Sequence, residues 1–513
     1  MVATYTGSVY DRPRRSLGVQ EYDLLAIDYV QGTADMNFAF FFDTPEAGAQ
    51  HPSTKCLHES LVRAIQLFPI LTGHIVNSRR GYKSRGKKKT AAADRWTVVV
   101  DPSHINWPAI SECRLDHVPF AQVKETMYRW DQWPVATKMA DLHSMQAQPL
   151  FGVHIVRYAC GATSIHTKMR HQVMDGNGLF RFYFTWARMC AHIHRGGGGL
   201  VRLTVADYPL CDRLICASKI IGSNGLTKQK PKSGKSAVEP CSKIAGCVYQ
   251  YMAKFEVFLR RLARHRRWHA VRAKSLPPAR IHRFAVSQEA LHSLKLRFGT
   301  LGACSPGNAF IRKHKIGYMT TNDLLLALFW RAVTRAHAII DPTDPYTCMS
   351  IACDIRKRIG LPATYTGNAS FPLPIHLTKQ MMQTHTIADT AAYIRYHVNL
   401  LSPEFARQMG NLLVSEKLMK RFAAMFHPAT SFFMASALAG FPMFQSLDFG
   451  MGGPAHIDIP PYLAPGFSIW LPTNPQENIF EPQCMLMNIS LRDDVFDYVL
   501  HDPEFRTFVN VIY

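Results

Sequence analysis

An alternating segment that ends in a histidine constrains the fold of this chain most strongly. From Ser164 to His171, Ile165, Thr167, Met169 and His171 share one parity and polar or charged residues take the other, which is the period of a half-buried strand. Gly176-Asn177-Gly178 interrupts this pattern. Apolar residues then recur at helical spacing, at Leu179, Phe180, Tyr183, Phe184 and Ala187. The segment predicts a strand, a turn and a helix in succession, with His171 at the end of the strand.

His171 and Asp175 form a His-x-x-x-Asp-Gly stretch across this predicted turn. A histidine at a strand end can face a cleft, and its near-neutral pKa suits it to general-base work. The spacing alone is common by chance in a chain with 23 histidines, and it fits a core histidine equally well. The motif therefore needs support from the rest of the chain.

Length and composition predict more than one domain. A chain of 513 residues with 47% apolar and 11% aromatic residues is globular and too long for one core. The breaks are four glycines at 196–199 and Pro277-Pro278, which predict an N-terminal lobe at 1–199, a basic crossover at 200–279 and a C-terminal lobe at 280–513. Strands are predicted at 96–100, 151–158, 163–171 and 280–286, and helices at 248–273 and 288–298.

Twelve scattered cysteines form no C-x-x-C pair, which argues against a zinc site and a disulfide scaffold. The first 18 residues lack the apolar core of a secretory signal, and the apolar stretch at 432–444 is too short to span a bilayer. These features predict a soluble, cytoplasmic protein with no metal and no membrane span.

The net charge of +22 is concentrated in two clusters, at Arg79–Lys89 and Lys228–Lys274. Basic surfaces attract nucleic acids, anionic membranes or small anions. No zinc-finger, RNA-recognition or basic-zipper pattern accompanies the clusters, so we expect no nucleic-acid partner. A solvated surface and a rim for an anionic ligand both remain compatible with them.

Eight motifs in register resemble those of the BAHD family of acyl-CoA-dependent acyltransferases, a branch of the HxxxD condensation-type superfamily, and suggest a fungal-type member. The matching segments are Leu24–Asp28, Leu57–His74, Pro149–Gly176, Asp207–Arg213, Thr320–Ala332, Asp354–Arg358, Tyr365–Ala369 and Asp448–Gly452. Any one of them is weak evidence, whereas their common order along the chain is specific.

The resemblance implies an α/β (α+β) fold of two similar-sized chloramphenicol-acetyltransferase-like lobes, each a mixed sheet with flanking helices. It implies transfer of an acyl group from acyl-CoA to a hydroxyl or amine of a small molecule. Acyl-CoA is then a co-substrate, no cofactor is permanently bound, and the protein is expected to be a monomer. Acetyl, benzoyl and hydroxycinnamoyl donors all fit this scaffold.

The resemblance also assigns roles to individual residues. His171 is the general base, Gly176 serves the turn, and Asp175 gives structural support by pairing with Arg356 or Arg358. For Asp448-Phe449-Gly450, a place beside CoA and a purely structural role stay open. The residues expected at the CoA site are Thr320, Thr321, Asn322, Arg356, Arg358, Asp448, Phe449 and Gly450.

Two departures from the family pattern are Met451 in place of a tryptophan and Thr366 in place of a phenylalanine. They leave the acceptor and the subgroup open. Two alternatives to the CoA-dependent reaction also stay open. One is a condensation-type catalyst whose acyl donor is bound to a carrier protein, and the other is a non-catalytic basic binding protein with the same fold.

Overall fold

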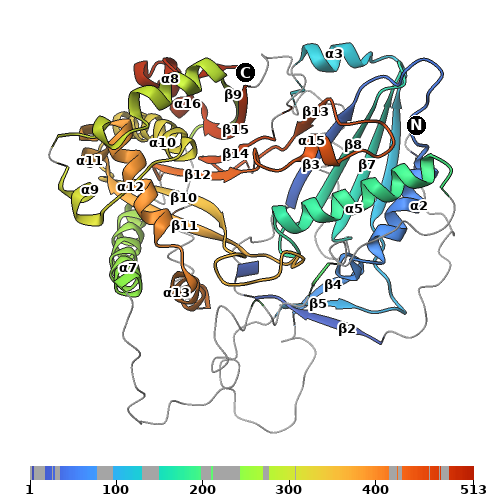
Figure 1. Cartoon of the computed structure of the whole chain (residues 1–513), viewed down its shortest axis with the longest axis horizontal. Coiled ribbons are helices and arrows are strands. Elements are labelled where there is room, and N and C mark those ends of the chain that lie inside the picture. Colours follow the sequence, from blue (N-terminus) through green and yellow to red (C-terminus); the bar gives the residue numbers. More distant parts are fainter. Residues whose placement is uncertain are drawn as a thin grey trace, which may run out of the picture. The chain divides into compact units, whose positions relative to one another are not determined.

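A computed structural model shows how the chain folds (Figure 1). It describes residues 3–4, 18–25, 27–28, 35–77, 96–126, 128–129, 149–197, 209–211, 216, 243–269, 276–306, 308–414, 425, 430–461, 463–472, 474 and 484–513. The basic cluster at Arg79–Lys89 lies outside these residues, as do residues 228–242 and 270–274 of the cluster at Lys228–Lys274.

The chain forms two compact units that are not contiguous in sequence. The first holds residues 1–216, 362–369 and 441–459, and the second holds 217–361, 370–440 and 460–513. The predicted lobes at 1–199 and 280–513 differ from this division, because two short segments of the second half pack within the first unit. One of these segments contains β13 (His456–Asp458), which pairs with β3 (Asp35–Phe42). Strand pairing at a sheet edge leaves no mark on local composition, so the sequence pattern could not reveal it.

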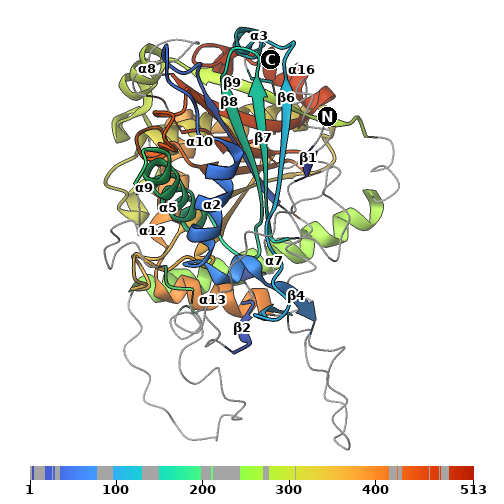
Figure 2. The same ribbon diagram turned by 90° about the vertical axis from the view of Figure 1, so that its right-hand side faces the viewer.

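The first unit is built on a six-stranded mixed sheet in the order β1-β6-β7-β8-β3-β13. A small antiparallel sheet, β2-β5-β4, accompanies it. Helices α2 and α5 cover one face of the larger sheet (Figures 1 and 2). The remaining bounds are β1 Ala3–Thr4, β2 Gln20–Asp23, α2 Thr54–Ile65, η1 Pro69–Thr72, β4 His74–Asn77, β5 Trp96–Val100, β6 Ala109–Leu115, α3 Phe120–Glu125, β7 Phe151–Tyr158, β8 Thr163–Arg170, α5 Gly176–His194 and α15 Met443–Ser446.

Helix α5 is fixed to its neighbours by buried aromatic side chains. Phe182 makes edge contacts with Phe151 of β7 at 5.0 Å and with Phe68 at 5.3 Å between ring centroids. The indole nitrogen of Trp186 donates to Leu57 O and Ser60 Oγ of α2, at 3.2 and 3.1 Å. The indole thus packs in the core while its polar atom is satisfied, as a buried tryptophan requires.

The predicted strand that leads to His171 is present as β8, but the prediction of a half-buried strand is wrong. Every residue from Thr163 to Met169 is buried, because β8 lies between β7 and β3 in the interior of the sheet. Polar side chains of β8 find their partners inside the protein rather than in solvent. Lys168 and Arg170 pair with Asp35 of β3 at 3.0 and 3.2 Å. Polar side chains that pair with each other can occupy a buried face, so alternation alone does not report exposure.

The second unit is built on a seven-stranded mixed sheet in the order β11-β10-β12-β14-β15-β9-β16. Helix α8 matches the prediction for 288–298, and β9 and α7 lie within a few residues of the predictions for 280–286 and 248–273. The bounds are α7 Lys243–His269, β9 Ala279–Val286, α8 Gln288–Phe298, η7 Leu301–Ala303, α9 Ala309–His314, α10 Thr321–Ile340, β10 Tyr346–Asp354, β11 Ser370–Thr378, α11 Lys379–Thr384, α12 Ile387–Asn399, α13 Pro403–Val414, β12 Phe432–Ala437, β14 Phe467–Trp470, β15 Met485–Arg492, α16 Asp493–Leu500, α17 Pro503–Arg506 and β16 Asn510–Val511.

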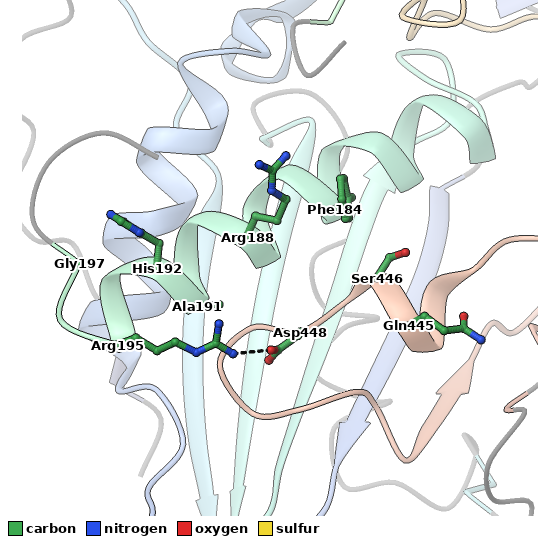
Figure 3. Close-up of a pocket in the computed structure, with 9 residues that line it drawn as sticks. All are labelled: Phe184, Arg188, Ala191, His192, Arg195, Gly197, Gln445, Ser446 and Asp448. Atoms are coloured by element: carbon green, nitrogen blue, oxygen red, sulfur yellow. Dashed lines mark hydrogen bonds and ion pairs between the residues drawn. The ribbon is translucent and has the colours of Figure 1, made fainter. Parts of the chain in front are cut away.

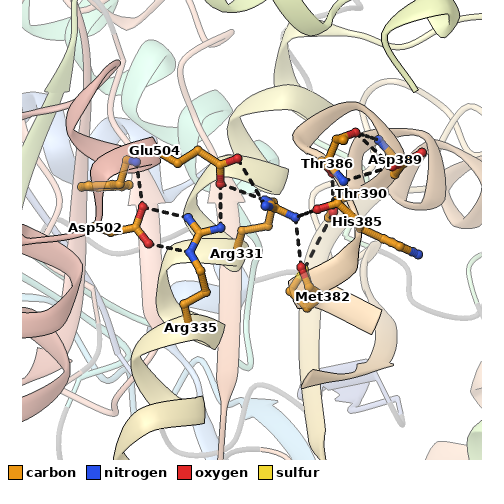
Figure 4. Close-up of polar contacts among 10 residues, drawn as sticks. Arg331, Arg335, Met382, His385, Thr386, Asp389, Thr390, Asp502 and Glu504 are labelled. Carbon is orange, nitrogen blue, oxygen red and sulfur yellow. Dashed lines mark hydrogen bonds and ion pairs between the residues drawn. The ribbon is translucent and has the colours of Figure 1, made fainter. Parts of the chain in front are cut away.

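Arg331 on α10 shows what the Phe329-Trp330-Arg331-Ala332 motif does (Figure 4). Its guanidinium makes two hydrogen bonds to Glu504 of α17, at 2.9 and 3.2 Å, and donates to the carbonyls of Met382 in α11 and of His385 directly after it. Arg335, one helical turn later, pairs with Asp502 and Glu504. A planar guanidinium can bind a carboxylate and two carbonyls together. The motif arginine therefore ties three helices of the second unit to each other.

Within the described parts of the chain, no helix is long and apolar enough to cross a bilayer. The same residues contain no cluster of three or more histidine, cysteine, aspartate or glutamate side chains arranged to hold a metal ion.

Candidate active site

His171 lies directly after β8, in the tight turn that leads to α5. The turn begins with a hydrogen bond from Val173 N to Arg170 O at 3.0 Å, and α5 starts five residues after His171, at Gly176. A strand from the interior of the sheet and a 19-residue helix thus fix the backbone on both sides of the histidine. This is the position that the sequence predicts for it.

The imidazole of His171 is held largely away from water. The residue is half-buried, and its Nδ1 atom is fully buried. Burial lowers the pKa of His171 below its ordinary value of 6.5, and the negative charges of Asp175 and Asp28 act against this effect without reversing it. A histidine whose pKa is lowered is neutral at pH 7, which is the form that can accept a proton.

Asn368 holds the turn that carries His171. Its side-chain nitrogen lies 3.0 Å from His171 O, 3.2 Å from Gln172 O and 2.7 Å from Asp28 Oδ1. The second carboxylate oxygen of Asp28 accepts from Leu25 N at 2.6 Å. Asn368 is fully buried, so these carbonyls have a partner where water is excluded. The Leu24–Asp28 and Tyr365–Ala369 motifs therefore meet at the backbone of the candidate base.

Sequence reasoning did not select Asn368 or Asp28 as site residues. The one sequence feature that could have identified them is that each belongs to a motif of the family resemblance, Asp28 to Leu24–Asp28 and Asn368 to Tyr365–Ala369. No pattern along the chain shows that residues 28, 171 and 368 lie within hydrogen-bonding distance of each other.

Asp175 is the N-cap of α5. Its Oδ1 accepts from Gly178 N at 3.1 Å, and its Oδ2 accepts from Ala369 N at 2.8 Å. Only 2% of the residue is exposed, so both oxygens bind backbone amides in the interior of the first unit. The carboxylate thus starts the helix and attaches the 362–369 segment to it. Structural support from Asp175 was predicted through Arg356 or Arg358. Both arginines belong to the second unit, and that pairing stays a prediction.

Gly178, in the first turn of α5, marks a close approach of two backbones. A Cβ atom at Gly178 would lie 2.1 Å from Thr366 O, a distance that no real side chain tolerates. Gly176 is the first residue of α5, and its backbone lies outside the left-handed region that would require glycine. The predicted role of Gly176 in the turn stays a prediction, and the close contact in this segment is at Gly178.

The residues around Thr320 begin a helix. The hydroxyl of Thr320 accepts from Asp323 N at 3.3 Å, and the Asp323 carboxylate accepts from Thr320 N at 2.7 Å, which is a capping box for α10. Arg395 of α12 pairs with Asp323 at 2.6 Å. Thr321 and Asn322 occupy the first two helical positions, and Asn322 is exposed. The predicted contacts of Thr320, Thr321 and Asn322 with CoA stay predictions.

Arg356 and Arg358 follow β10 and have different partners in the second unit. Arg356 is buried and pairs with Asp354 at 3.2 Å. Arg358 donates to Val398 O at 3.1 Å and to Leu401 O at 2.7 Å, and so caps the carboxyl end of α12. Their predicted roles at a CoA site are not tested by these contacts.

Asp448 organises the loop of the Asp448–Gly452 motif. Its Oδ1 accepts three backbone N–H groups, from Gly450, Met451 and Gly452, at 2.7, 3.1 and 3.0 Å. Its Oδ2 pairs with Arg195, directly after α5, at 2.7 Å (Figure 3). Gly450 has a φ of +95°, and a Cβ there would lie 2.9 Å from the ring of His194. The first and third residues of the motif are therefore explained by the geometry of the turn.

Phe449 anchors the same loop in the core of the first unit. It is fully buried and makes an edge contact with Trp186 at 4.9 Å between ring centroids and another with Phe42 at 5.9 Å. The groove between this loop and α5 has a volume of about 620 Å³ (Figure 3). Since α5 has 19 residues, or a length of about 28 Å, Arg195 and Asp448 lie at the end of the helix opposite the His171 turn. These contacts support the structural reading of the motif.

We expect Asp448→Ala to lower thermal stability without weakening the use of acyl-CoA. The change removes an acceptor for three backbone amides and the partner of Arg195, and should cost about 1–3 kcal/mol. The measurement is the Tm together with KM for acyl-CoA, with Asp116→Ala as the control because Asp116 is exposed and pairs only at the surface, with Arg114. A KM raised tenfold at unchanged Tm would instead indicate that Asp448 contacts CoA.

Two family models match this chain. One is described as the Transferase family and matches residues 307–462, and the other is described as the Trichothecene 3-O-acetyltransferase-like N-terminal domain and matches residues 36–190. Tryptamine benzoyltransferase 1 of Oryza sativa subsp. japonica is 22% identical over 90% of this chain and 88% of its own length. O-acetyltransferase epaC of Aspergillus niger is 25% identical over 39% of this chain and 43% of its own length.

Solved structures share the fold. TRI101 of F. graminearum in complex with ethyl coenzyme A superimposes with a TM-score of 0.67 at 13% identity, over 96% of this chain and 100% of that one. Vinorine synthase superimposes with a TM-score of 0.59 at 13% identity, over 97% and 96% of the two chains. The α/β fold expected from the sequence is confirmed by these matches.

Proposed function

The chain belongs to the Transferase family of BAHD-type, acyl-CoA-dependent acyltransferases, and from this premise we propose that His171 is its general base. The reaction moves an acyl group from acyl-CoA to a hydroxyl or amine of a small-molecule acceptor. The observation that carries the assignment is the position of His171. It is a half-buried imidazole with a lowered pKa, fixed between a buried strand and a capped helix.

The proposed reaction needs two proton transfers at one histidine. The neutral imidazole removes the proton of the acceptor O–H or N–H as the acceptor attacks the thioester carbonyl. A bond from the acceptor oxygen or nitrogen to the carbonyl carbon forms, and the carbonyl oxygen takes the negative charge. When that intermediate collapses, the carbon–sulfur bond breaks and the imidazolium returns its proton to the departing CoA sulfur. The acyl group thus passes directly to the acceptor.

The groups around His171 prepare it for this task without reacting themselves. Asn368 restrains the backbone carbonyls of His171 and Gln172, and Asp175 restrains both the start of α5 and Ala369. A base whose backbone is held on both sides does not need to be ordered when the substrates bind, which lowers the entropic cost of the transition state. Asn368, Asp28 and Asp175 are positioning residues in this proposal.

The donor and acceptor are proposals of a broader class. The relatives are named as benzoyl-, hydroxycinnamoyl- and acetyltransferases, and they include enzymes named for amine acceptors and O-acetyltransferases. We therefore propose an acetyl or aromatic acyl donor and an alcohol or amine of a specialised metabolite as acceptor. A cytoplasmic location and a monomeric state complete the proposal.

Intact-protein mass spectrometry tests direct transfer. With acyl-CoA and no acceptor, the mass of the protein should stay unchanged, because the proposed route forms no acyl-enzyme. A stable mass increase equal to one acyl group in the wild type, absent from His171→Ala, would contradict direct transfer. It would indicate that His171 acts as a nucleophile and not as a general base.

The pH dependence of kcat/KM should reflect the lowered pKa of His171. Because His171 must be neutral and its pKa is lowered, the acid limb of kcat/KM should have its midpoint below pH 6.5. The measurement is a pH–rate profile with an alcohol acceptor, since an amine acceptor would itself titrate. An acid limb with its midpoint above 6.5 would contradict the assignment.

Asn368→Ala should lower kcat more than it raises KM. The loss of its contacts frees the two carbonyls of the His171 turn, and a small displacement of the base should cost roughly tenfold to a hundredfold in rate. Steady-state kinetics well below the Tm of the variant separate this effect from unfolding. Asn106→Ala is the control, because the side chain of Asn106 also donates to a backbone carbonyl, Gly73 O at 3.2 Å, but to neither carbonyl of the His171 turn. Equal losses of kcat in Asn368→Ala and Asn106→Ala would contradict the positioning role of Asn368.

A further inference from the structure

Two cysteine thiols meet between helices α2 and α5. The Sγ atoms of Cys56 and Cys190 are 4.0 Å apart, and Cys56 Sγ also lies 3.8 Å from Cys190 O. Cys56 is in the first turn of α2 and Cys190 is near the end of α5, and the proposed reaction uses neither thiol. Figure 2 shows the two helices beside each other on the same face of the sheet. The distance between the sulfurs is that of thiols in contact, and a disulfide would require them to approach by about 2 Å.

The two thiols differ in their access to solvent. Cys190 is fully buried, whereas Cys56 is half-buried. A small oxidant from solution therefore reaches Cys56 first, and Cys190 is placed as a second thiol behind it. This is the arrangement of a reactive cysteine with a resolving partner.

The surroundings of Cys56 favour its thiolate. The Cys190 thiol, as a hydrogen-bond donor, is the largest influence on the pKa of Cys56 and lowers it, while burial and the negative charge of Glu59 act against this effect without reversing it. The first turn of α2 contributes the positive end of the helix dipole. The thiolate is the form of cysteine that reacts with peroxides.

We propose that Cys56 and Cys190 form a peroxide-sensitive thiol pair that closes to a disulfide between α2 and α5. In the first step the Cys56 thiolate attacks one oxygen of hydrogen peroxide, which gives a sulfenic acid and, with one proton, water. In the second step the Cys190 sulfur attacks the Cys56 sulfur, the S–S bond forms, and the sulfenic oxygen leaves as a second water. Two thiols and one peroxide thus yield one disulfide and two waters, and a dithiol reductant reverses the change.

Peptide mapping under non-reducing conditions tests the pair. Trypsin releases Cys56 in the peptide Cys56–Arg63 and Cys190 in the peptide Met189–Arg195. After brief treatment of the full-length protein with hydrogen peroxide and blocking of the remaining thiols, these two peptides should appear joined, at the sum of their masses less two hydrogens. Reduction before digestion should separate them again.

Three variants make the result decisive. In Cys190→Ser the joined peptides should vanish and Cys56 should be labelled by dimedone, which traps sulfenic acids. Cys56→Ser should leave Cys190 unoxidised, and because Cys56 is half-buried this variant tests the pair even if the buried Cys190→Ser fails to fold. Cys160→Ser removes an exposed cysteine and should leave the joined peptides unchanged. Oxidation at Cys160 without the Cys56–Cys190 linkage would overturn the proposal. Disulfides that join cysteines at random, with no preference for Cys56 and Cys190, would overturn it as well.

Discussion

Replacement of His171 by alanine is expected to lower kcat by ~10²–10⁴-fold, the usual contribution of a positioned acid–base group. The change removes the group that accepts the proton of the acceptor and returns it to CoA. It should have little effect on stability, because His171 is half-buried and the hydrogen bonds that Asn368 donates to this turn are accepted by backbone carbonyls, which alanine keeps. The measurement is release of free CoA at saturating acyl-CoA and acceptor, together with the Tm of the variant.

A matched control separates loss of the base from loss of any histidine. His104→Ala removes a side chain that is 81% exposed, and it should change neither kcat nor Tm. Retention of more than a tenth of the wild-type kcat in a folded His171→Ala protein would rule out the proposed base. It would favour the alternative of a binding protein that keeps the fold.

Asp175→Ala is expected to have the largest effect on stability among the residues of the site. It removes the N-cap of α5 and the partner of Ala369 N, which leaves two buried amides without an acceptor. The loss of a cap costs about 1 kcal/mol and a buried unsatisfied amide about 1–3 kcal/mol, so a loss of about 2–4 kcal/mol is expected. The rate should fall with it, since the cap fixes the helix that follows the His171 turn. Asp175→Asn should lose less, because one amide oxygen can still cap the helix.

Ser53→Ala provides the comparison for Asp175. Ser53 caps α2 with a single hydrogen bond to Cys56 N at 3.2 Å and makes no second link comparable to Asp175–Ala369. Chemical denaturation of both variants should therefore show a larger loss for Asp175→Ala. Equal losses in the free energy of unfolding would indicate that Asp175 contributes no more than an ordinary helix cap. An unchanged stability of Asp175→Ala would contradict its supporting role.

The local elements of this fold could be predicted well from the sequence. The strand before His171, the helix after Gly176 and the helix at 288–298 follow from periodicity, because side chains at fixed spacing share a face. The exposure of the polar face of β8 could not be predicted in the same way. Lys168, Arg170 and Asp35 satisfy each other in the interior, and this requires knowledge of the neighbouring strand.

The candidate site was predictable only in its central residue. The spacing and the resemblance select His171 and Asp175, but the contacts that hold them come from residues almost 200 positions away. Asn368 Nδ2 and Ala369 N reach the turn because the 362–369 segment packs in the first unit. Such long-range pairing is a property of tertiary packing and leaves no local periodicity.

The role of the Asp448–Gly452 motif could not be decided from its sequence either. Its sequence is compatible with both a ligand loop and a turn, and its contacts are those of a turn. Met451 contributes its backbone N–H to Asp448, a bond that any residue except proline can make. The hydrogen bonds of this turn therefore do not require the tryptophan that the family commonly has at this position.

The most direct measurement of the central claim is mass-spectrometric detection of acylated product. Wild type and His171→Ala should each be incubated with acetyl-, benzoyl- and hydroxycinnamoyl-CoA against a panel of alcohols and amines. The proposed function predicts at least one donor–acceptor pair for which the wild type forms acylated product and an equal amount of free CoA, with product from His171→Ala reduced by at least a hundredfold. Formation of the same product at the same rate by both proteins, or CoA release without any acylated product, would contradict it.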